Sequence, residues 1–343
     1  MSIKTAPISH FVHLSDWDDS TLYDVLEKAS QLKSDDFRKP VATGKVLGLI
    51  FFNPSLRTRI SFETAAFHLG AGVSIIQPGQ GTWTFETKKG VVMDSTRTEH
   101  LKEAIQVISR YVDILGVRAF AGMKNRQEDM EDLLIRDIEK YATVPVINLE
   151  SAMEHPCQAL ADGLTIWEQF EKKAEGKKFV LSWAPHPKPL PMAVPNSALE
   201  IAARMGMEVT LACPREMTPD QRILDKIGKH AGRHGTQLQI EHNQDTAFED
   251  ADVIYGKSWA GPLVYNDPDA ENELRTKTYS GWMIDKPLMS KTNKAKFMHC
   301  LPVRRNVVVS DAVMDSPYSI HVTQAENRLH VQKAVLMKLL NMK

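Results

Sequence analysis

The sequence of 343 residues contains only three cysteines, Cys157, Cys213 and Cys300, and none of them belongs to a CxxC pair. So few thiols exclude a disulfide-stapled scaffold and are typical of a protein from a reducing compartment. No apolar run approaches the roughly 20 residues that a membrane-spanning helix needs, and residues 1–19 have no apolar core of signal-peptide length. We therefore expect a cytoplasmic protein that does not enter a membrane.

An excess of either charge is also missing. The 42 Lys and Arg residues nearly balance the 43 Asp and Glu residues, and the formal net charge is −1. Without a basic excess, general electrostatic attraction to nucleic acid or to an anionic membrane is not expected. At roughly 150 residues per domain, the length predicts about two folded domains.

The common metal and nucleotide motifs are absent as well. The sequence has no HExxH, no paired CxxC and no EF-hand loop, so we expect neither a metal nor a cofactor. Gly70 and Gly72 are not followed by the third glycine of GxGxxG, and Gly44 and Lys45 do not complete a P-loop. A nucleotide site is therefore disfavoured.

The sequence does contain a regular alternation of short apolar runs and longer amphipathic stretches. This alternation predicts an α/β fold with two open, mostly parallel sheets. In the first half, strands are expected at 46–52, 73–77, 114–118 and 144–149, and helices near 17–34, 59–69, 99–112 and 126–141. After a helix near 156–173, strands are expected at 179–183, 208–212, 253–255 and 297–300, and helices near 193–205 and 217–234. The last segment, 326–342, is expected to form a helix that packs back on the first domain.

One loop between an expected strand and an expected helix carries groups that bind phosphate. Residues 53–59 read Asn-Pro-Ser-Leu-Arg-Thr-Arg and follow the apolar run at 46–52. At such a junction, free backbone N–H groups and the positive end of the helix dipole face a ligand. The hydroxyl and guanidinium groups of the loop add further donors. The loop predicts a phosphate site, although a helix cap beside two solvated arginines would have the same sequence.

Polar groups also follow other expected strands. His155 and Gln158 open a helix after the strand at 144–149, Arg118 ends the strand at 114–118, and His299 and Cys300 end a strand of the second series. In open α/β sheets, ligands collect at the carboxyl ends of the strands. Each position has an ordinary alternative, namely a capping or buried histidine, a surface ion pair for Arg118 and a packed thiol for Cys300.

Three motifs taken together resemble the transcarbamylase (aspartate/ornithine carbamoyltransferase) family. They are Ser-Leu-Arg-Thr-Arg at 55–59, His-Pro-Cys-Gln at 155–158 and His-Cys-Leu-Pro at 299–302. The resemblance implies a carbamoyl phosphate-binding domain at 1–152, completed by the C-terminal helix 322–343, and an acceptor-binding domain at 153–321. It also implies a homotrimer whose active sites are shared between subunits.

The resemblance assigns roles to individual residues. Thr58, Arg118 and His155 match the groups that act on the carbamoyl carbonyl, and they are the expected catalytic residues. Trp83 lies in a polar loop and matches a residue that reaches the neighbouring subunit's carbamoyl phosphate. The ordinary alternative for Trp83 is packing within its own loop. The full set expected to bind carbamoyl phosphate is Ser55, Leu56, Arg57, Thr58, Trp83, Arg118, His155, Gln158, Cys300, Leu301 and Arg328.

The acceptor implied by the resemblance is an N2-acylornithine, which would make the enzyme part of arginine biosynthesis. Ordinary ornithine transcarbamylases have Ser-Met-Gly where this chain reads Tyr-Gly-Lys-Ser-Trp at 255–259. A cation at Lys257 would repel a free α-ammonium group but suits an acylated acceptor. The residues expected to bind the acylornithine are Glu150, His186, Lys188, Lys257 and Arg304.

Thr98 bears on the identity of the acyl group. Acetyl-type sequences of this branch have Glu at this position, and succinyl-type sequences have a non-acidic residue, typically Pro. Because a carboxylate would repel a succinyl tail, Thr98 favours N2-succinyl-L-ornithine, with N2-acetyl-L-ornithine as the alternative. Val308 agrees, since the acetyl type has a lysine there. A non-catalytic regulator that binds a phosphorylated metabolite is less favoured, because all three motifs are intact.

Overall fold

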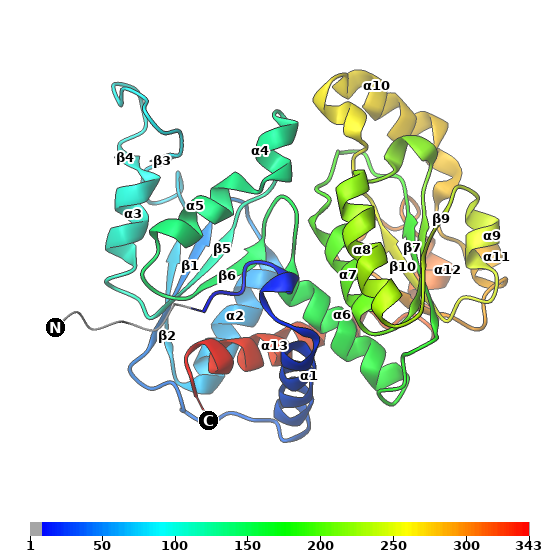
Figure 1. Cartoon of the computed structure of the whole chain (residues 1–343), viewed down its shortest axis with the longest axis horizontal. Helices are drawn as coiled ribbons and strands as arrows, with labels where there is room; N and C mark the ends of the chain where they lie inside the picture. Colours follow the sequence, from blue (N-terminus) through cyan, green and yellow to red (C-terminus); the bar gives the residue numbers. More distant parts are fainter. Residues whose placement is uncertain (1–8, 343) are drawn as a thin grey trace.

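The structure is a computed structural model that describes residues 9–342. Two α/β units lie side by side, each built on an open sheet (Figure 1). The first sheet has the order β2-β1-β5-β6, with β1 (Val46–Phe51), β2 (Gly72–Ile76), β5 (Ile114–Arg118) and β6 (Val146–Glu150). The second has the order β11-β10-β7-β8-β9, with β7 (Lys178–Trp183), β8 (Glu208–Ala212), β9 (Leu238–Glu241), β10 (Val253–Lys257) and β11 (Lys296–Met298).

Every strand pairing in both sheets is parallel, which confirms the predicted α/β class. Parallel strands are covered on both faces, so their sequences are continuous apolar runs such as the one at 46–52. Because all strands of a sheet point the same way, their carboxyl ends form one edge. The predicted site residues that follow the strands are thereby brought to these edges.

The longer helices of the first unit are α1 (Asp19–Ser34), α2 (Leu56–Leu69), α3 (Leu101–Ile108) and α5 (Leu133–Tyr141), with the short α4 (Arg126–Met130) between them. Those of the second unit are α7 (Ala193–Arg204) and α8 (Gln221–Arg233), with the short α9 (Gln244–Phe248), α10 (Pro268–Glu273), α11 (Lys286–Met289) and α12 (Asp311–Met314). α6 (Pro156–Gln169) lies between the units, and α13 (His321–Leu339) ends the fold (Figure 1). Two-residue strands β3 (Phe85–Glu86) and β4 (Glu99–His100) pair with each other.

Some of the predicted boundaries were wrong. The single helix expected at 126–141 is interrupted at Asp132, whose φ is 53°, in the left-handed region. The Asp132 carboxylate accepts hydrogen bonds from the Ser151 hydroxyl and the Ala152 N–H, and these contacts fix the break. The helix expected at 99–112 covers only α3, because His100 caps its first turn by accepting from the Lys102 N–H. The helix expected at 217–234 starts at Gln221, and the strand β9 was not predicted.

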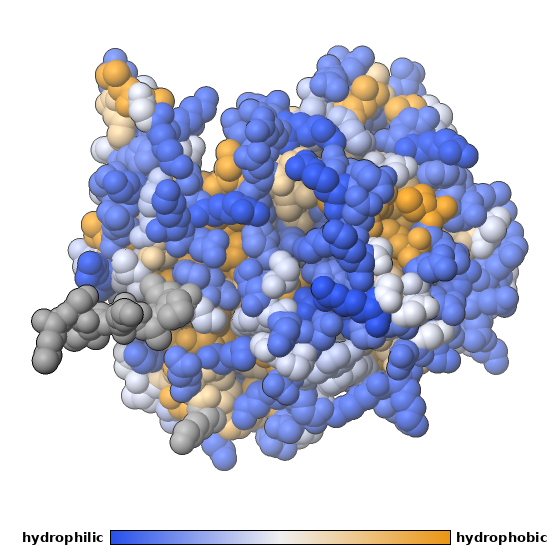
Figure 2. Space-filling model, viewed as in Figure 1, coloured by the Kyte–Doolittle hydropathy of each residue, from blue (hydrophilic) through white to orange (hydrophobic). Residues whose placement is uncertain are grey.

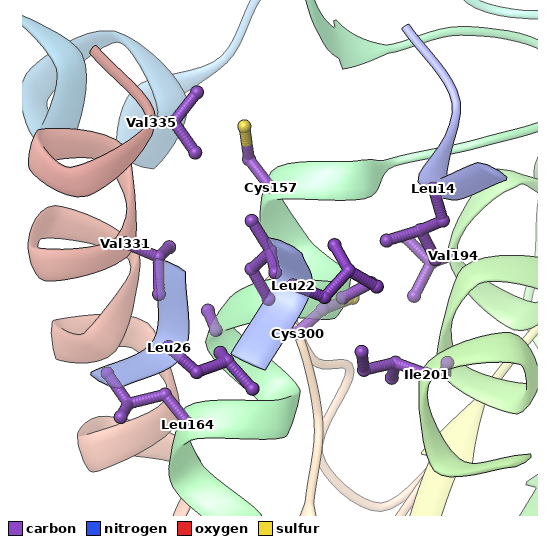
Figure 3. Packing of buried hydrophobic residues seen from close by; sticks show 14 of the residues in the cluster. Leu14, Leu22, Leu26, Cys157, Leu164, Val194, Ile201, Cys300, Val331 and Val335 are labelled. Carbon is purple, nitrogen blue, oxygen red and sulfur yellow. The ribbon is translucent and has the colours of Figure 1, made fainter. Parts of the chain in front are cut away.

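The C-terminal helix returns to the first unit, as predicted, although it starts at His321 rather than Glu326 and ends at Leu339. α13 packs most extensively against α6, α1 and α2. In Figure 3, Val331 of α13, Leu164 of α6 and Leu26 of α1 lie in one buried cluster. Burying each such side chain contributes about 1.5–3 kcal/mol to the free energy of unfolding. This packing fixes α13 beside the helices that carry the predicted site.

Within residues 9–342, no helix combines the length and the apolar character that crossing a membrane requires. In the same part of the chain, no three or more His, Cys, Asp and Glu side chains gather in a way that would hold a metal ion.

Candidate active site

The predicted phosphate loop lies between the end of β1 and the start of α2. Ser55 caps α2, since its Oγ accepts a hydrogen bond from the Thr58 N–H at 3.3 Å. Thr58 is fully buried, and its Oγ1 accepts from Nη2 of Arg328 at 2.6 Å. Nε of Arg57 is buried and has no hydrogen-bond partner among residues 9–342. The hydroxyl of Thr58 and the guanidinium groups of Arg57 and Arg328 are thus the polar groups at the start of α2. The side chain of Leu56 is exposed, so Leu56 can contribute only its backbone to a phosphate site.

Arg118 and His155 meet at the ends of β5 and β6. Nη1 of Arg118 donates to Oε2 of Glu150 at 2.5 Å, and Nε2 of His155 lies 3.7 Å from the same oxygen. The Arg118 guanidinium also lies over the Phe120 ring, 4.3 Å from its centroid. The backbone of His155 is fixed by a hydrogen bond from its N–H to Oγ of Ser197 at 2.8 Å.

The electrostatics of this region are dominated by cations, since Arg118 and Arg328 are buried and Arg57 is half-buried. Burial, together with the charges of Arg118 and Arg57, lowers the pKa of Arg328 to about 10, and the charge of Glu150 opposes them. Burial also lowers the pKa of Arg57, and the charge of Arg118 acts in the same direction. Arginine side chains keep their charge in proteins at neutral pH. Three cations near one carboxylate leave a positive surplus that favours an anionic ligand.

Burial holds the pKa of His155 well below its ordinary value of 6.5, and the charges of Arg328, Arg118 and Lys257 act in the same direction. The imidazole is therefore neutral at physiological pH. A neutral imidazole donates from one nitrogen and accepts at the other, so His155 can donate a hydrogen bond to a carbonyl oxygen.

The His-Cys-Leu-Pro segment follows β11. Nδ1 of His299 accepts from the Leu301 N–H at 2.8 Å, and Leu301 has a φ of 57°, in the left-handed region that non-glycine residues seldom adopt. Burial raises the pKa of the Cys300 thiol, so it is a packed thiol and not an activated nucleophile.

Two residues that the sequence analysis missed lie beside Gln158. Oδ1 of Asp162 accepts from Nε2 of Gln158 at 2.8 Å and from Nε2 of Gln324 at 2.7 Å. Asp162 follows Gln158 by four residues, a spacing that places two side chains on one face of a helix and that could have drawn attention to it. Gln324 comes from the distant helix α13, and no local pattern indicates it.

The groups predicted to bind the acceptor only partly come together. Nε of Arg304 donates to Nε2 of His186 at 3.0 Å, and Nδ1 of His186 lies 2.8 Å from the carbonyl oxygen and 3.0 Å from the backbone nitrogen of Lys188. Lys188 thereby holds His186 through its backbone, and its side chain is exposed. Lys257 ends β10 and is half-buried, and its charge adds to the burial that lowers the pKa of His186.

Trp83 and Thr98 lie apart from these groups, on an arm formed by residues 77–100. The arm projects from the first unit on the side away from the second (Figure 1). Nε1 of Trp83 donates to Glu99 at 2.6 Å, and Thr98 is exposed. Figure 2 shows hydrophobic surface at the tip of the arm, where Val92 is 81% exposed. Within one chain, the structure does not bring Trp83 or Thr98 to the other predicted residues.

Family models match both units of the chain. The carbamoyl-P binding domain of aspartate/ornithine carbamoyltransferase matches residues 9–168, and the Asp/Orn binding domain of the same family matches residues 192–339. The chain belongs to the aspartate/ornithine carbamoyltransferase family. It is a carbamoyltransferase, and its similarity to N-acetylornithine and N-succinylornithine carbamoyltransferases supports the acylornithine branch.

Two curated carbamoyltransferases and one solved structure illustrate this similarity. The chain is 44% identical to an N-acetylornithine carbamoyltransferase of Xanthomonas axonopodis pv. citri (strain 306), over 97% of this chain and 96% of the relative. It is 40% identical to an N-succinylornithine carbamoyltransferase of Bacteroides fragilis (strain 638R), over 93% and 95% of the two chains. A crystal structure of an N-acetyl-L-ornithine transcarbamylase variant, with one glutamate replaced by proline, contains carbamyl phosphate and N-succinyl-L-norvaline. It matches with a TM-score of 0.94 at 44% identity, covering 97% of this chain and 100% of that one.

The charge state of His155 in this carbamoyltransferase can be measured directly. At pH 6.5 we expect His155 to be neutral, because burial and three cations oppose its protonation. His13 is the internal contrast, since the hydrogen bond and charge of Glu154 outweigh burial and raise its pKa above 6.5. Histidine 15N NMR should therefore show His13 mainly protonated and His155 neutral at pH 6.5, with His155→Gln and His13→Gln variants to assign the signals. A His155 midpoint at or above 6.5 would contradict the electrostatic description.

Proposed function

We propose that this carbamoyltransferase transfers the carbamoyl group from carbamoyl phosphate to the δ-amine of an N2-acylornithine, giving N2-acylcitrulline and phosphate. The observation that carries the proposal is the cluster of Arg57, Arg118 and Arg328, whose charges interact with one another and of which Arg328 donates to Thr58 at the start of α2. The phosphate would bind the N-terminus of α2 and the guanidinium groups of this cluster. A helix N-terminus and bidentate arginines are well suited to a phosphate dianion.

The carbonyl oxygen of carbamoyl phosphate would face Thr58, Arg118 and His155. Negative charge develops on this oxygen when an amine attacks the carbonyl carbon, and preorganised donors in a dry site stabilise it. The neutral imidazole of His155 suits this role, since it donates without adding a further charge to a crowded cationic site.

The neutral δ-amine of the acceptor would form a bond to the carbonyl carbon and give a tetrahedral species. The bond from this carbon to the phosphate oxygen then breaks, and the departing phosphate takes the proton that the amine loses. Glu150, which already binds Arg118, would orient the amine. No covalent enzyme intermediate is needed, in agreement with the packed thiol of Cys300, and much of the acceleration comes from holding two substrates in one cleft.

The acyl group of the acceptor could be acetyl or succinyl. The preference for the succinyl substrate, expected from Thr98, is not confirmed, because the acetylornithine enzyme is the more similar of the two relatives, at 44% against 40% identity. We therefore propose N2-acetyl-L-ornithine as the acceptor. N2-succinyl-L-ornithine remains the second candidate, because Thr98 adds no carboxylate, and a relative that has lost a glutamate is solved with a succinyl ligand.

We further propose that the protein is a homotrimer in which the arm completes the site of a neighbouring subunit. Trp83 and Thr98 lie away from the cleft of their own chain, and the arm tip exposes hydrophobic side chains that a neighbour would cover. Trp83 would then contact the neighbour's carbamoyl phosphate, and Thr98 would face the neighbour's acyl group.

The substrate assignment is tested by incubating the protein with carbamoyl phosphate and N-acetyl-, N-succinyl- or free ornithine and measuring citrulline products. We expect turnover with an acylornithine, acetyl before succinyl, and little with free ornithine, whose α-ammonium group Lys257 repels. A Thr98→Glu variant should lose activity with the succinyl substrate and keep it with the acetyl substrate. Activity with free ornithine and with neither acylornithine would contradict the proposal, and so would the lack of activity with all three acceptors.

Shared active sites are tested by mixing two inactive variants. Trp83→Ala and Arg57→Ala trimers should each have little activity, because each lacks one contact to carbamoyl phosphate. After subunit exchange, some interfaces combine an intact arm with an intact phosphate loop, and part of the activity should return. Mixing two separate Trp83→Ala preparations under the same conditions is the control, and it should restore no activity. No recovery in mixed trimers would contradict the sharing of sites.

A further inference from the structure

We propose that Asp162 is a positioning residue that fixes the amide of Gln158, so that its oxygen faces the donor substrate and recognises the NH2 group of carbamoyl phosphate. The inference deepens the proposed function and rests on it, because it assumes that carbamoyl phosphate binds beside Gln158. It names the group that distinguishes a carbamoyl phosphate from an acyl phosphate of the same shape.

Asp162 lies on α6 one turn beyond Gln158, and both side chains are about 99% buried. Oδ1 of Asp162 accepts a hydrogen bond from Nε2 of Gln158 at 2.8 Å. The same oxygen accepts from Nε2 of Gln324, on α13, at 2.7 Å. One carboxylate oxygen thus holds two glutamine amides, one from each of the two helices.

The orientation of this network follows from a backbone group that cannot be reversed. The N–H of His299 donates to Oε1 of Gln324 at 2.8 Å. A backbone N–H is only a donor, so the oxygen of Gln324 must face His299 and its NH2 group must face Asp162. Oδ1 of Asp162 therefore accepts from Gln324, and because an ionised carboxylate is only an acceptor, the atom of Gln158 that contacts it must be the NH2 nitrogen. Reversing Gln158 would bring two oxygen atoms into contact.

This orientation is that of the ionised Asp162 carboxylate. Burial raises the pKa of Asp162 to about 7. A proton on Oδ2 preserves the orientation, because Oδ1 then still accepts both N–H groups. The buried hydroxyl of Tyr255 lies close to the Asp162 carboxyl group.

With its nitrogen bound to Asp162, Gln158 has its oxygen turned away from this carboxylate. Oε1 of Gln158 is buried and has no hydrogen-bond partner within residues 9–342. A buried acceptor without a partner is costly, so a ligand that supplies a donor there gains affinity. Gln158 lies in the first turn of α6, and its N–H donates to the carbonyl of His155, the N-cap residue of this helix, at 3.0 Å. This acceptor therefore lies at the helix end from which His155 would hold the carbamoyl carbonyl.

Carbamoyl phosphate has two N–H donors at the position where acetyl phosphate has a methyl group. Two unreactive phosphonates reproduce this difference, because phosphonoacetamide carries the NH2 group and acetonylphosphonate carries the methyl. The wild-type protein should bind phosphonoacetamide roughly tenfold more tightly, as expected for one buried hydrogen bond. Calorimetric titration of both compounds gives the affinity ratio without any catalytic step.

An Asp162→Val variant removes the acceptor while keeping a side chain of similar size. Gln158 is then free to turn its NH2 group toward the ligand, and the affinity ratio should fall roughly tenfold, to near one. An Asp162→Asn variant retains an oxygen at the Oδ1 position and should keep the ratio within about twofold of the wild type. In a Gln158→Met background, where the ratio is already near one, adding Asp162→Val should change nothing further.

Thr165→Val is the matched control for loss of structure at the same helix pair. Thr165 lies one turn beyond Asp162, is fully buried, donates to the Ala161 carbonyl and accepts from Asn327 of α13. It does not contact Gln158, so its substitution should lower the melting temperature and leave the affinity ratio unchanged.

The outcomes separate the inference from the function on which it rests. If the wild type forms no acylcitrulline from carbamoyl phosphate, the proposed function is wrong. If the wild type is active but binds the two phosphonates equally, or if folded Asp162→Val keeps the wild-type ratio, the role of Asp162 is wrong. Should Asp162→Val fail to fold, as judged by circular dichroism, Asp162→Ala takes its place with the same expected ratio.

Discussion

The mutual repulsion of three guanidinium groups, two buried and one half-buried, is the constraint on which the rest of the structure depends. Arg57, Arg118 and Arg328 come from the start of α2, the end of β5 and the middle of α13, and Arg57 is the half-buried one. Taking charges out of water is costly unless they are paired, and among residues 9–342 the one carboxylate in a salt bridge with any of them is Glu150, which pairs with Arg118. A dianion bound at this cluster would relieve the repulsion.

The apolar packing of α13 supplies the stability that such a site requires. Val331, Leu164 and Leu26 pack where α13, α6 and α1 meet, and the same helix presents Arg328 to Thr58 and Gln324 to Asp162. One helix thus connects the phosphate loop, the helix that carries His155 and Gln158, and the His-Cys-Leu-Pro segment. Hydrophobic burial has no preferred direction, but here it holds α13 in the position that the directional hydrogen bonds of Arg328 and Gln324 require.

Much of this arrangement could be predicted from local sequence, and the failures have a common physical cause. Apolar runs indicated all but one strand of the two main sheets, and the loop at 53–59 indicated the start of α2. The interruption at Asp132 and the contact of Gln324 with Asp162 depend on partners more than 15 residues away, which no local pattern encodes. Within residues 9–342, Trp83 and Thr98 lie apart from the other predicted site residues, since the arm projects away from the second unit. The acyl preference inferred from Thr98 and Val308 was likewise not confirmed by the comparison of whole sequences.

The most direct test of this account is the affinity for carbamoyl phosphate, measured by calorimetric titration of the wild type and of an Arg57→Ala variant. The surplus of positive charge in this cluster predicts that the wild type binds carbamoyl phosphate. Removing Arg57 should weaken binding by about 1.5–3 kcal/mol, the contribution of a charge-assisted hydrogen bond. Equal affinity in the two proteins, or no binding by the wild type, would contradict the assignment of this cationic cluster as the dianion site.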